Sequence, residues 1–128
     1  MSNYNWKNKS ILIADDDILN FELLKLMLRN TEINIIHFNN GQAVIDYFEE
    51  NSAADIIIMD IQMPVLDGKA TTKLLREKGH TLPIIALTAL NTSSEQSKYK
   101  EIGFNEVVEK PIRKEAFLLL IDKSLTSE

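Results

Sequence analysis

The stretch Ile56-Ile57-Ile58-Met59-Asp60 runs through four apolar residues directly into a carboxylate. Four consecutive apolar residues place apolar side chains on both faces of a strand, as in a parallel sheet that helices cover on both sides. Such a strand carries Asp60 to the edge of the core, whereas an ordinary loop carboxylate would lie further out. The sequence therefore predicts a buried parallel strand with an acidic residue at its carboxyl end.

Working outward from this stretch, apolar runs of strand length alternate with longer segments of helical period. Strands are predicted at Ile11–Ala14, Ile33–Phe38, Ile56–Met59, Ile84–Leu87 and Val107–Val108. Helices are predicted at Ile18–Arg29, after Asn39-Asn40-Gly41, between Asp67 and Gly79, between Thr92 and Gly103, and at Arg113–Leu125. This alternation predicts an α/β fold with a parallel sheet. We expect one domain over residues 9–126, preceded by a lead-in over residues 1–8.

Residues that favour helix ends support these boundaries. Asp17 and Asp67 are interpreted as N-caps, because a side-chain oxygen at that position accepts from the first free N–H groups of a helix. Thr92 is followed three residues later by Glu95, which is the pattern of a capping box. Gly103 is placed to end the fourth helix.

Composition limits the classes of protein that the chain can represent. Its 128 residues suffice for one domain, and 45% of them are hydrophobic. The chain has no cysteine, so we expect no disulfide framework and a cytoplasmic location. No apolar run approaches the roughly 18 residues of a membrane span. With a net charge of −5 and no Lys/Arg cluster, the chain does not favour direct binding of nucleic acid.

After the first, third, fourth and fifth predicted strands come, in turn, Asp15 with Asp16, then Asp60, Thr88 and Lys110. Right-handed crossovers require the strand order of an open sheet to reverse, and a crevice opens there at the carboxyl ends of the strands. If the first and third strands are neighbours, three carboxylates gather in this crevice. Each pair at about 4 Å repels by roughly 4 kcal/mol at an effective dielectric near 20, so the cluster needs a counter-charge.

A cation bound by oxygen ligands fits this cluster. Carboxylate, carbonyl and water oxygens select Mg²⁺, with Mn²⁺ as the alternative. A zinc site would lack ligands, because the chain has only His37 and His80 and no cysteine; we interpret both histidines as structural or solvated. Mg²⁺ commonly binds one or two carboxylates together with a substrate phosphate, which indicates phosphoryl chemistry.

The remaining groups suit the acceptance of a phosphoryl group. Asp60 can act as a nucleophile and form an aspartyl phosphate, while the ammonium of Lys110 and the hydroxyl of Thr88 can hold phosphoryl oxygens. No obvious base for activating water is present, which favours an acceptor that keeps the group over an enzyme. The simpler alternative is that Asp15 and Asp16 only cap the first helix. Their joint placement with Asp60 and Lys110 favours the functional interpretation.

Taken together, the motifs resemble the receiver domain of two-component response regulators over nearly the whole chain. The resemblance rests on Ile11-Leu12-Ile13-Ala14-Asp15-Asp16-Asp17, on the stretch from Ile57 to Gly68 that contains Asp60 and Met63-Pro64, on Leu87-Thr88-Ala89 and on Glu109-Lys110-Pro111. It implies a flavodoxin-like, doubly wound sheet of order 2-1-3-4-5 with five helices. It also implies phosphorylation of Asp60 by a phosphohistidine of a sensor histidine kinase or a histidine phosphotransfer protein.

By position, the resemblance implies that Asp16 and Asp60 bind Mg²⁺ directly, Gln62 through its main-chain carbonyl and Asp15 through water. Lys110 would pair with the phosphoryl group, Thr88 would move toward it as a switch, and the bond before Pro111 would be cis.

Positions flanking this site show where the chain departs from its relatives. Val107 stands where many receivers have an aromatic residue that turns inward on activation, so only the hydroxyl half of that relay is expected here. Ala89 and Leu90 follow Thr88, and we hypothesise that Leu90, with Gln62, shields the phosphoryl group from water.

Two other functions fit these residues less well. Phosphatases that use an aspartyl phosphate usually place a second Asp two residues after the nucleophile, but Gln62 stands there. A flavin-binding electron carrier needs a Gly/Ser/Thr-rich phosphate loop after the first strand, where Asp15-Asp16-Asp17 would repel the phosphate.

We expect the receiver to act on a downstream output protein or domain. The sequence ends with the fifth helix, so we expect either a stand-alone regulator or the receiver segment of a hybrid kinase or longer regulator. The apolar run Ala116–Ile121 leaves two interpretations open. We favour core burial, and the alternative is a surface for a partner or for a phosphorylation-dependent dimer.

Overall fold

The structure, a computed structural model, describes residues 4–89 and 92–126. Within them five strands and five helices alternate, which confirms the predicted α/β class. The strands are β1 (Ser10–Ala14), β2 (Asn34–Phe38), β3 (Ile56–Asp60), β4 (Ile84–Thr88) and β5 (Glu106–Glu109). The helices are α1 (Ile18–Met27), α2 (Gly41–Glu49), α3 (Gly68–Glu77), α4 (Ser93–Ile102) and α5 (Lys114–Thr126).

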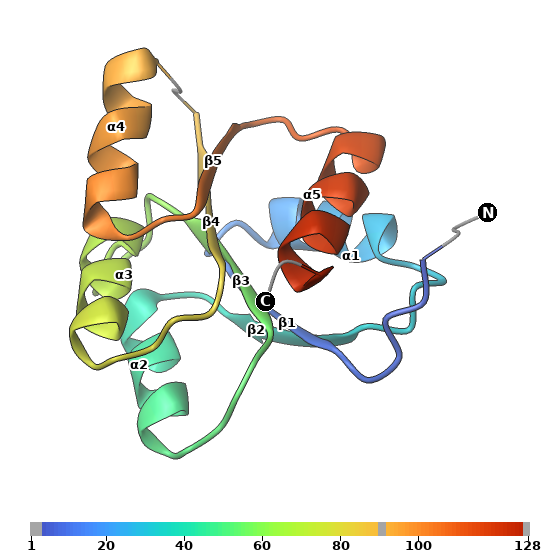
Figure 1. The fold of residues 1–128 in the computed structure, drawn as a ribbon, viewed down its shortest axis with the longest axis horizontal. Coiled ribbons are helices and arrows are strands. Elements are labelled where there is room, and N and C mark those ends of the chain that lie inside the picture. The colour runs from blue at the N-terminus through green and yellow to red at the C-terminus, as the bar shows by residue number, and fades with distance from the viewer. Residues whose placement is uncertain (1–3, 90–91, 127–128) are drawn as a thin grey trace.

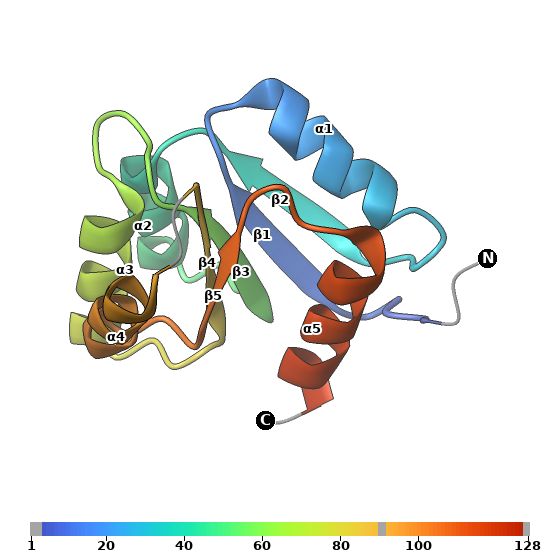
Figure 2. The same ribbon diagram turned by 90° about the horizontal axis from the view of Figure 1, so that it is seen from above.

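The strands form one parallel sheet of order β2-β1-β3-β4-β5, as predicted. Helices α1 and α5 cover one face of the sheet, and α2, α3 and α4 cover the other (Figure 1; Figure 2). This is the flavodoxin-like, doubly wound arrangement. All five strands run in the same direction, so the residues that follow them gather at one edge of the sheet.

The strand register decides which of these residues become neighbours. Ala14 of β1 is paired with Met59 of β3, so the next residues, Asp15 directly after β1 and Asp60 at the end of β3, lie at the same level. On the other side of β3, Thr88 of β4 is paired with Glu109 of β5. Lys110 therefore leaves β5 beside Thr88, and its N–H donates to the carbonyl oxygen of Thr88 at 2.8 Å.

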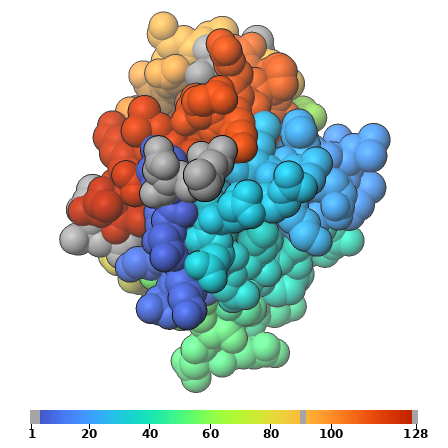
Figure 3. Space-filling view, turned by 90° about the vertical axis from the view of Figure 1, so that its right-hand side faces the viewer, coloured from blue at the N-terminus to red at the C-terminus, as the bar shows by residue number. Residues whose placement is uncertain are grey.

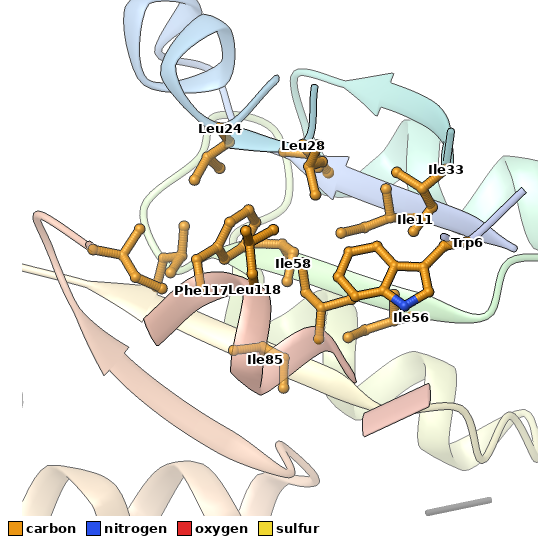
Figure 4. Close-up of a cluster of buried hydrophobic side chains, with 14 of the residues drawn as sticks. Trp6, Ile11, Leu24, Leu28, Ile33, Ile56, Ile58, Ile85, Phe117 and Leu118 are labelled. Carbon is orange, nitrogen blue, oxygen red and sulfur yellow. The ribbon is translucent and has the colours of Figure 1, made fainter. Parts of the chain in front are cut away.

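The central strands are buried on both faces, because a helical layer covers each side. Every residue of β3 and β4 is buried, as the unbroken apolar runs predict. Their side chains divide between two cores. Ile58 and Ile85 face the layer that contains Phe117 of α5 (Figure 4), whereas Met59 belongs to the core beneath α2 and α3.

The helices begin at the caps that the sequence indicates. The side chain of Asp17 accepts from the N–H groups of Leu19 and Asn20, and that of Asp67 accepts from Ala70. At α4, Thr92 accepts from the N–H of Glu95 at 3.3 Å. The predicted caps therefore fix the start of these helices, and α1 ends two residues earlier than Arg29 at Met27.

The predicted lead-in contributes to the core. Trp6 is 6% exposed and packs among Ile11, Ile33 and Ile56 (Figure 4). The main-chain N–H of Trp6 donates to the carbonyl oxygen of Thr31 at 2.7 Å, so this segment is held against the residues that precede β2. Figure 3 shows the dark-blue N-terminal segment lying between α5 and the cyan stretch after α1. Residues before β1 therefore cover the end of the α1/α5 core that lies at the start of the strands.

The apolar run in α5 is divided between core and surface. Phe117, Leu118 and Ile121 are buried, while Leu119 is 61% exposed. Ala116 is also exposed and Leu120 is half-buried, so core burial accounts for Phe117, Leu118 and Ile121 but not for the whole run. Among the described residues, no helix has the length and apolar character needed to cross a membrane.

Candidate functional site

Three carboxylates meet at the carboxyl edge of the sheet. Asp15 and Asp16 follow β1, Asp60 ends β3, and one carboxylate oxygen from each lies within 4.8 Å of the others. Asp15 and Asp60 are buried, whereas Asp16 is exposed. The convergence predicted from the sequence is therefore present in the fold. All donors in the cluster are oxygen atoms, which are the ligands that Mg²⁺ prefers.

Lys110 supplies a positive charge to the same cluster. Its Nζ donates to Oδ1 of Asp60 at 3.1 Å, and its side chain is 28% exposed. Burial raises the pKa of Asp60 from the ordinary 3.8 to about 6; the bond from Lys110 opposes this rise, and the charge of Asp15 adds to it. Without a metal, the single amine does not fully offset the burial and crowding of these carboxylates.

An open pocket of about 870 Å³ lies over the cluster. The predicted site residues that line it are Asp16, Asp60, Gln62, Thr88, Ala89 and Lys110. Asp60 and Thr88 are 5% and 7% exposed, so each borders the pocket from a buried strand end. The pocket gives a small phosphorylated group access to the carboxylate of Asp60.

Two predicted residues, Val107 and Pro111, are not among those that line this pocket. Val107 is half-buried and packs against the core beneath α3, so no aromatic side chain occupies this position on β5. Pro111 is exposed, and the bond between Lys110 and Pro111 is cis, as expected. Leu90 lies outside the described residues, and its predicted shielding role stays a prediction.

The loop between β3 and α3 forms one wall of the pocket. The N–H of Leu66 donates to the carbonyl oxygen of Pro64 at 2.7 Å, which closes a γ-turn around Val65. Val65 has a φ of 69°, a left-handed conformation that β-branched residues rarely adopt. The turn presents Val65 to solvent at 80% exposure.

Gly68 allows the start of α3 to approach β3. A Cβ atom at this position would lie 2.3 Å from the carbonyl oxygen of Asp60 and 3.0 Å from Cα of Ile61. The Gly68 N–H donates to the carbonyl oxygen of Ile61 at 2.9 Å. Glycine here lets α3 pack directly against the strand end that carries Asp60.

Several residues around the site were not identified from the sequence. Asn20 donates its side-chain amide to Oδ2 of Asp15, and His37 contacts the carbonyl oxygen of the same residue. Lys69, Glu95 and Tyr99 line the pocket from α3 and α4. The spacing of these residues carries no recognisable motif. His37 comes to the site from β2, and the packing of α1, α3 and α4 brings the others.

The geometry agrees with the comparisons between this chain and known proteins. The profile of the response regulator receiver domain matches residues 11–122, and the chain belongs to this family. It is a receiver domain of the two-component type, and its acidic pocket fits a phosphoacceptor aspartate that depends on magnesium.

Relatives include response regulators and much longer hybrid kinases. The chain is 36% identical over 114 residues to the two-component response regulator ARR22 of Arabidopsis thaliana, covering 88% of this chain and 80% of the plant protein. It is 34% identical over 112 residues to hybrid signal transduction histidine kinase I of Dictyostelium discoideum, covering 81% of this chain but 6% of the kinase. Matching regions thus represent from 6% to 80% of these two relatives.

Solved structures share the fold over nearly the whole chain. The receiver domain of sensor histidine kinase PA1611 from Pseudomonas aeruginosa, solved with a magnesium ion coordinated in its active-site cleft, superposes with a TM-score of 0.80 at 28% identity. The match covers 91% of this chain and 97% of that domain. A response regulator from Chloroflexus aurantiacus gives a TM-score of 0.82 at 29% identity, covering 91% and 97% of the two chains.

Proposed function

We propose that Asp60 is the residue that accepts a phosphoryl group from a partner phosphohistidine. The observation that carries this proposal is the position of its carboxylate, which borders the pocket between two acidic neighbours and the Lys110 amine. No other described carboxylate outside this cluster has the same combination of burial, acidic neighbours and a bonded lysine. The family membership supports the same choice.

In the transfer step, a carboxylate oxygen of Asp60 attacks the phosphorus atom of the donor. The new O–P bond forms as the N–P bond to the donor imidazole breaks, and the imidazole nitrogen takes the bonding electron pair. Lys110, 3.1 Å from Oδ1 of Asp60, is placed to neutralise charge on the transferred group. The Thr88 hydroxyl, at the pocket edge, donates to a phosphoryl oxygen.

A divalent cation fits the acidic cluster, because oxygen atoms of three carboxylates converge there. We expect Asp16 and Asp60 to bind Mg²⁺ through their carboxylates, Gln62 through its main-chain carbonyl and Asp15 through water. Mn²⁺ has similar ligand preferences and can replace it. When bound, the ion neutralises negative charge at the reacting oxygens.

We propose that the domain holds the phosphoryl group as a signal and does not act as a phosphatase. Gln62 lines the pocket two residues after Asp60, where an aspartyl-phosphate phosphatase needs a carboxylic acid. The phosphoryl group adds about two negative charges at neutral pH, and these attract Lys110 and Thr88. Movement of these residues at the ends of β4 and β5 changes the surface offered to an output protein or domain.

The exposed face of α1 is the proposed docking surface for the phosphohistidine partner. Ile18, Leu19, Leu23 and Leu26 are 58%, 79%, 44% and 59% exposed, although all four are apolar. This helix begins directly after the acidic pair, beside the pocket. An apolar surface at this place fits a helical kinase or phosphotransfer partner. A cytoplasmic location and dimerisation on phosphorylation stay predictions.

Intact mass measurement tests the central proposal. After incubation with acetyl phosphate and Mg²⁺, the wild-type chain should gain one phosphoryl mass, and Asp60→Asn should gain none. A gain of equal size in Asp60→Asn would contradict the assignment. Steady hydrolysis of small phosphate esters by the wild-type protein would instead favour the phosphatase alternative.

A further inference from the structure

Four hydrogen bonds hold Asp15, two through its main chain and two through its carboxylate. Two of them fix its main chain: its N–H donates to the carbonyl oxygen of Phe38 at 3.0 Å, and its own carbonyl oxygen lies 2.9 Å from Nε2 of His37. A carbonyl oxygen can only accept, so Nε2 of His37 carries the proton in this contact. The His37 ring also stacks on Phe21 of α1, with ring centroids 3.7 Å apart. The main chain of Asp15 is therefore fixed independently of its carboxylate.

The other two bonds fix the carboxylate itself. Oδ1 of Asp15 accepts from the N–H of Asp17 at 2.9 Å, and Oδ2 accepts from the side-chain amide of Asn20. The first donor belongs to the backbone, which a substitution cannot remove. Asn20 is therefore the side chain that determines where Oδ2 of Asp15 lies.

Burial and charge make this second donor important. Asp15 is 1% exposed, so water cannot replace a lost hydrogen bond without rearrangement. Lys110 is bonded to Asp60, and no lysine or arginine among the described residues forms an ion pair with Asp15. Without the amide of Asn20, Oδ2 would face the negative charges of Asp16 and Asp60 and would turn away from them.

We propose that Asn20 is a positioning residue that holds the Asp15 carboxylate in its cation-binding orientation and thereby sets the Mg²⁺ affinity of the site. This inference rests on the proposed function, because it assigns a role toward the same cluster. Asn20 acts through Asp15, since its amide is bonded to that carboxylate. Partners that orient metal ligands commonly change metal affinity by 10–100-fold when they are removed.

The test is calorimetric titration of the full chain with Mg²⁺ at pH 7.5. Asn20→Leu keeps a similar shape but has no donor, and we expect its Mg²⁺ affinity to fall about tenfold. Asn20→Ser keeps a donor on a shorter side chain and should lose less affinity. Lys25→Gln, a change at an exposed position in the last turn of the same helix, should leave the affinity unchanged. Unchanged or tighter binding by both Asn20 variants would overturn the inference.

A double-mutant cycle separates positioning from a general structural effect. In an Asp15→Asn background the carboxylate is absent, so Asn20→Leu should no longer change the Mg²⁺ affinity. An equal tenfold loss in both backgrounds would show that Asn20 does not act through Asp15, and this result also overturns the inference. Failure of the wild-type chain to bind Mg²⁺ would overturn the proposed function as well, which makes the two failures distinguishable.

Discussion

Nζ of Lys110 lies 3.1 Å from Oδ1 of Asp60, although 50 positions separate the two residues in the chain. The pair forms because β3 and β5 flank β4 in the sheet, which brings their carboxyl ends together. Even with this bond, burial keeps the pKa of Asp60 raised to about 6. The carboxylates of the metal-free site therefore repel one another, and a substitution that removes the charge of Asp60 should raise stability while it weakens cation binding.

Removing the charge of Asp60 should stabilise the metal-free protein. The carboxyl of Asp60 has a pKa of about 6 in the fold, compared with an ordinary value of 3.8. The fold therefore favours the protonated carboxyl, and this stabilisation is fully present below pH 4 and is lost as the pH rises through 6. Asp60→Asn should therefore be more stable than wild type by about 1–3 kcal/mol at pH 7 and by much less at pH 4. Urea unfolding in EDTA at both pH values measures the difference, and equal stability at pH 7 would contradict this expectation.

Acidification should weaken cation binding at Asp60. Protons compete with Mg²⁺ for a carboxylate, and the raised pKa of about 6 puts this competition close to neutral pH. Lowering the pH from 7.5 to 5.5 should weaken the Mg²⁺ affinity by about fourfold through this residue alone. Titration calorimetry at the two pH values tests this, and Asp60→Asn should show a smaller change. Identical affinities at both pH values would be inconsistent with the raised pKa.

A methyl group at position 68 should disturb the main chain that carries Asp60. Gly68→Ala would place its Cβ 2.3 Å from the carbonyl oxygen of Asp60, so α3 or the end of β3 must move. We expect a loss of about 1–3 kcal/mol in stability together with weaker Mg²⁺ binding. Gly79→Ala is the comparison, because its φ of 92° makes alanine strained while nothing lies within 4 Å of the added Cβ. That variant should lose stability but retain its Mg²⁺ affinity.

A charge on the exposed face of α1 should slow phosphorylation by a phosphohistidine partner but not phosphorylation by acetyl phosphate. Leu19 is 79% exposed, so Leu19→Asp should leave the fold intact. Transfer from a phosphohistidine partner should slow by at least about tenfold, as for loss of a central apolar contact. Phosphorylation by acetyl phosphate, which needs no docking surface, should be unchanged. Gln96→Asp on α4, across the sheet, serves as the control, and equal slowing by both variants would refute docking at α1.

A buried hydroxyl in α3 should be dispensable. Oγ1 of Thr72 is buried and has no hydrogen-bond partner in the described part of the chain. Thr72→Val preserves the shape and removes an unsatisfied group, so it should raise stability by about 1 kcal/mol. Thr71→Val offers the matched contrast, because Oγ1 of Thr71 donates to the carbonyl oxygen of Asp67 at 2.7 Å. Urea unfolding should rank Thr72→Val above wild type and Thr71→Val below it.

The buried strands are predictable because their apolar runs are unbroken, as at Ile56–Met59, which the structure extends by one residue to Asp60. The sequence was less informative at β5, where two residues were predicted and four form the strand. Glu106 and Glu109 begin and end this edge strand. An edge strand is partly exposed to solvent, so charged residues can occupy its ends and remove the apolar signal.

The positions of the site residues were predictable for a related reason. Asp15, Asp60, Thr88 and Lys110 each lie at or directly after the end of a strand, and parallel strands end at one edge. Asn20 lies five residues after Asp15 on a helix, and nothing in that spacing indicates a bond between the two. Its contact depends on how α1 packs against the sheet, which the residue pattern does not specify.

The lone tryptophan of the chain lies at the opposite end of the strands from the acidic cluster. Trp6 packs beside Ile11 and Ile56, near the start of β1 and β3, whereas the carboxylates follow the last residues of those strands. Its intrinsic fluorescence should therefore follow unfolding of the α1/α5 core and stay silent when a cation or phosphoryl group arrives. Trp6 is therefore an intrinsic fluorescent probe of folding that lies far from the acidic cluster.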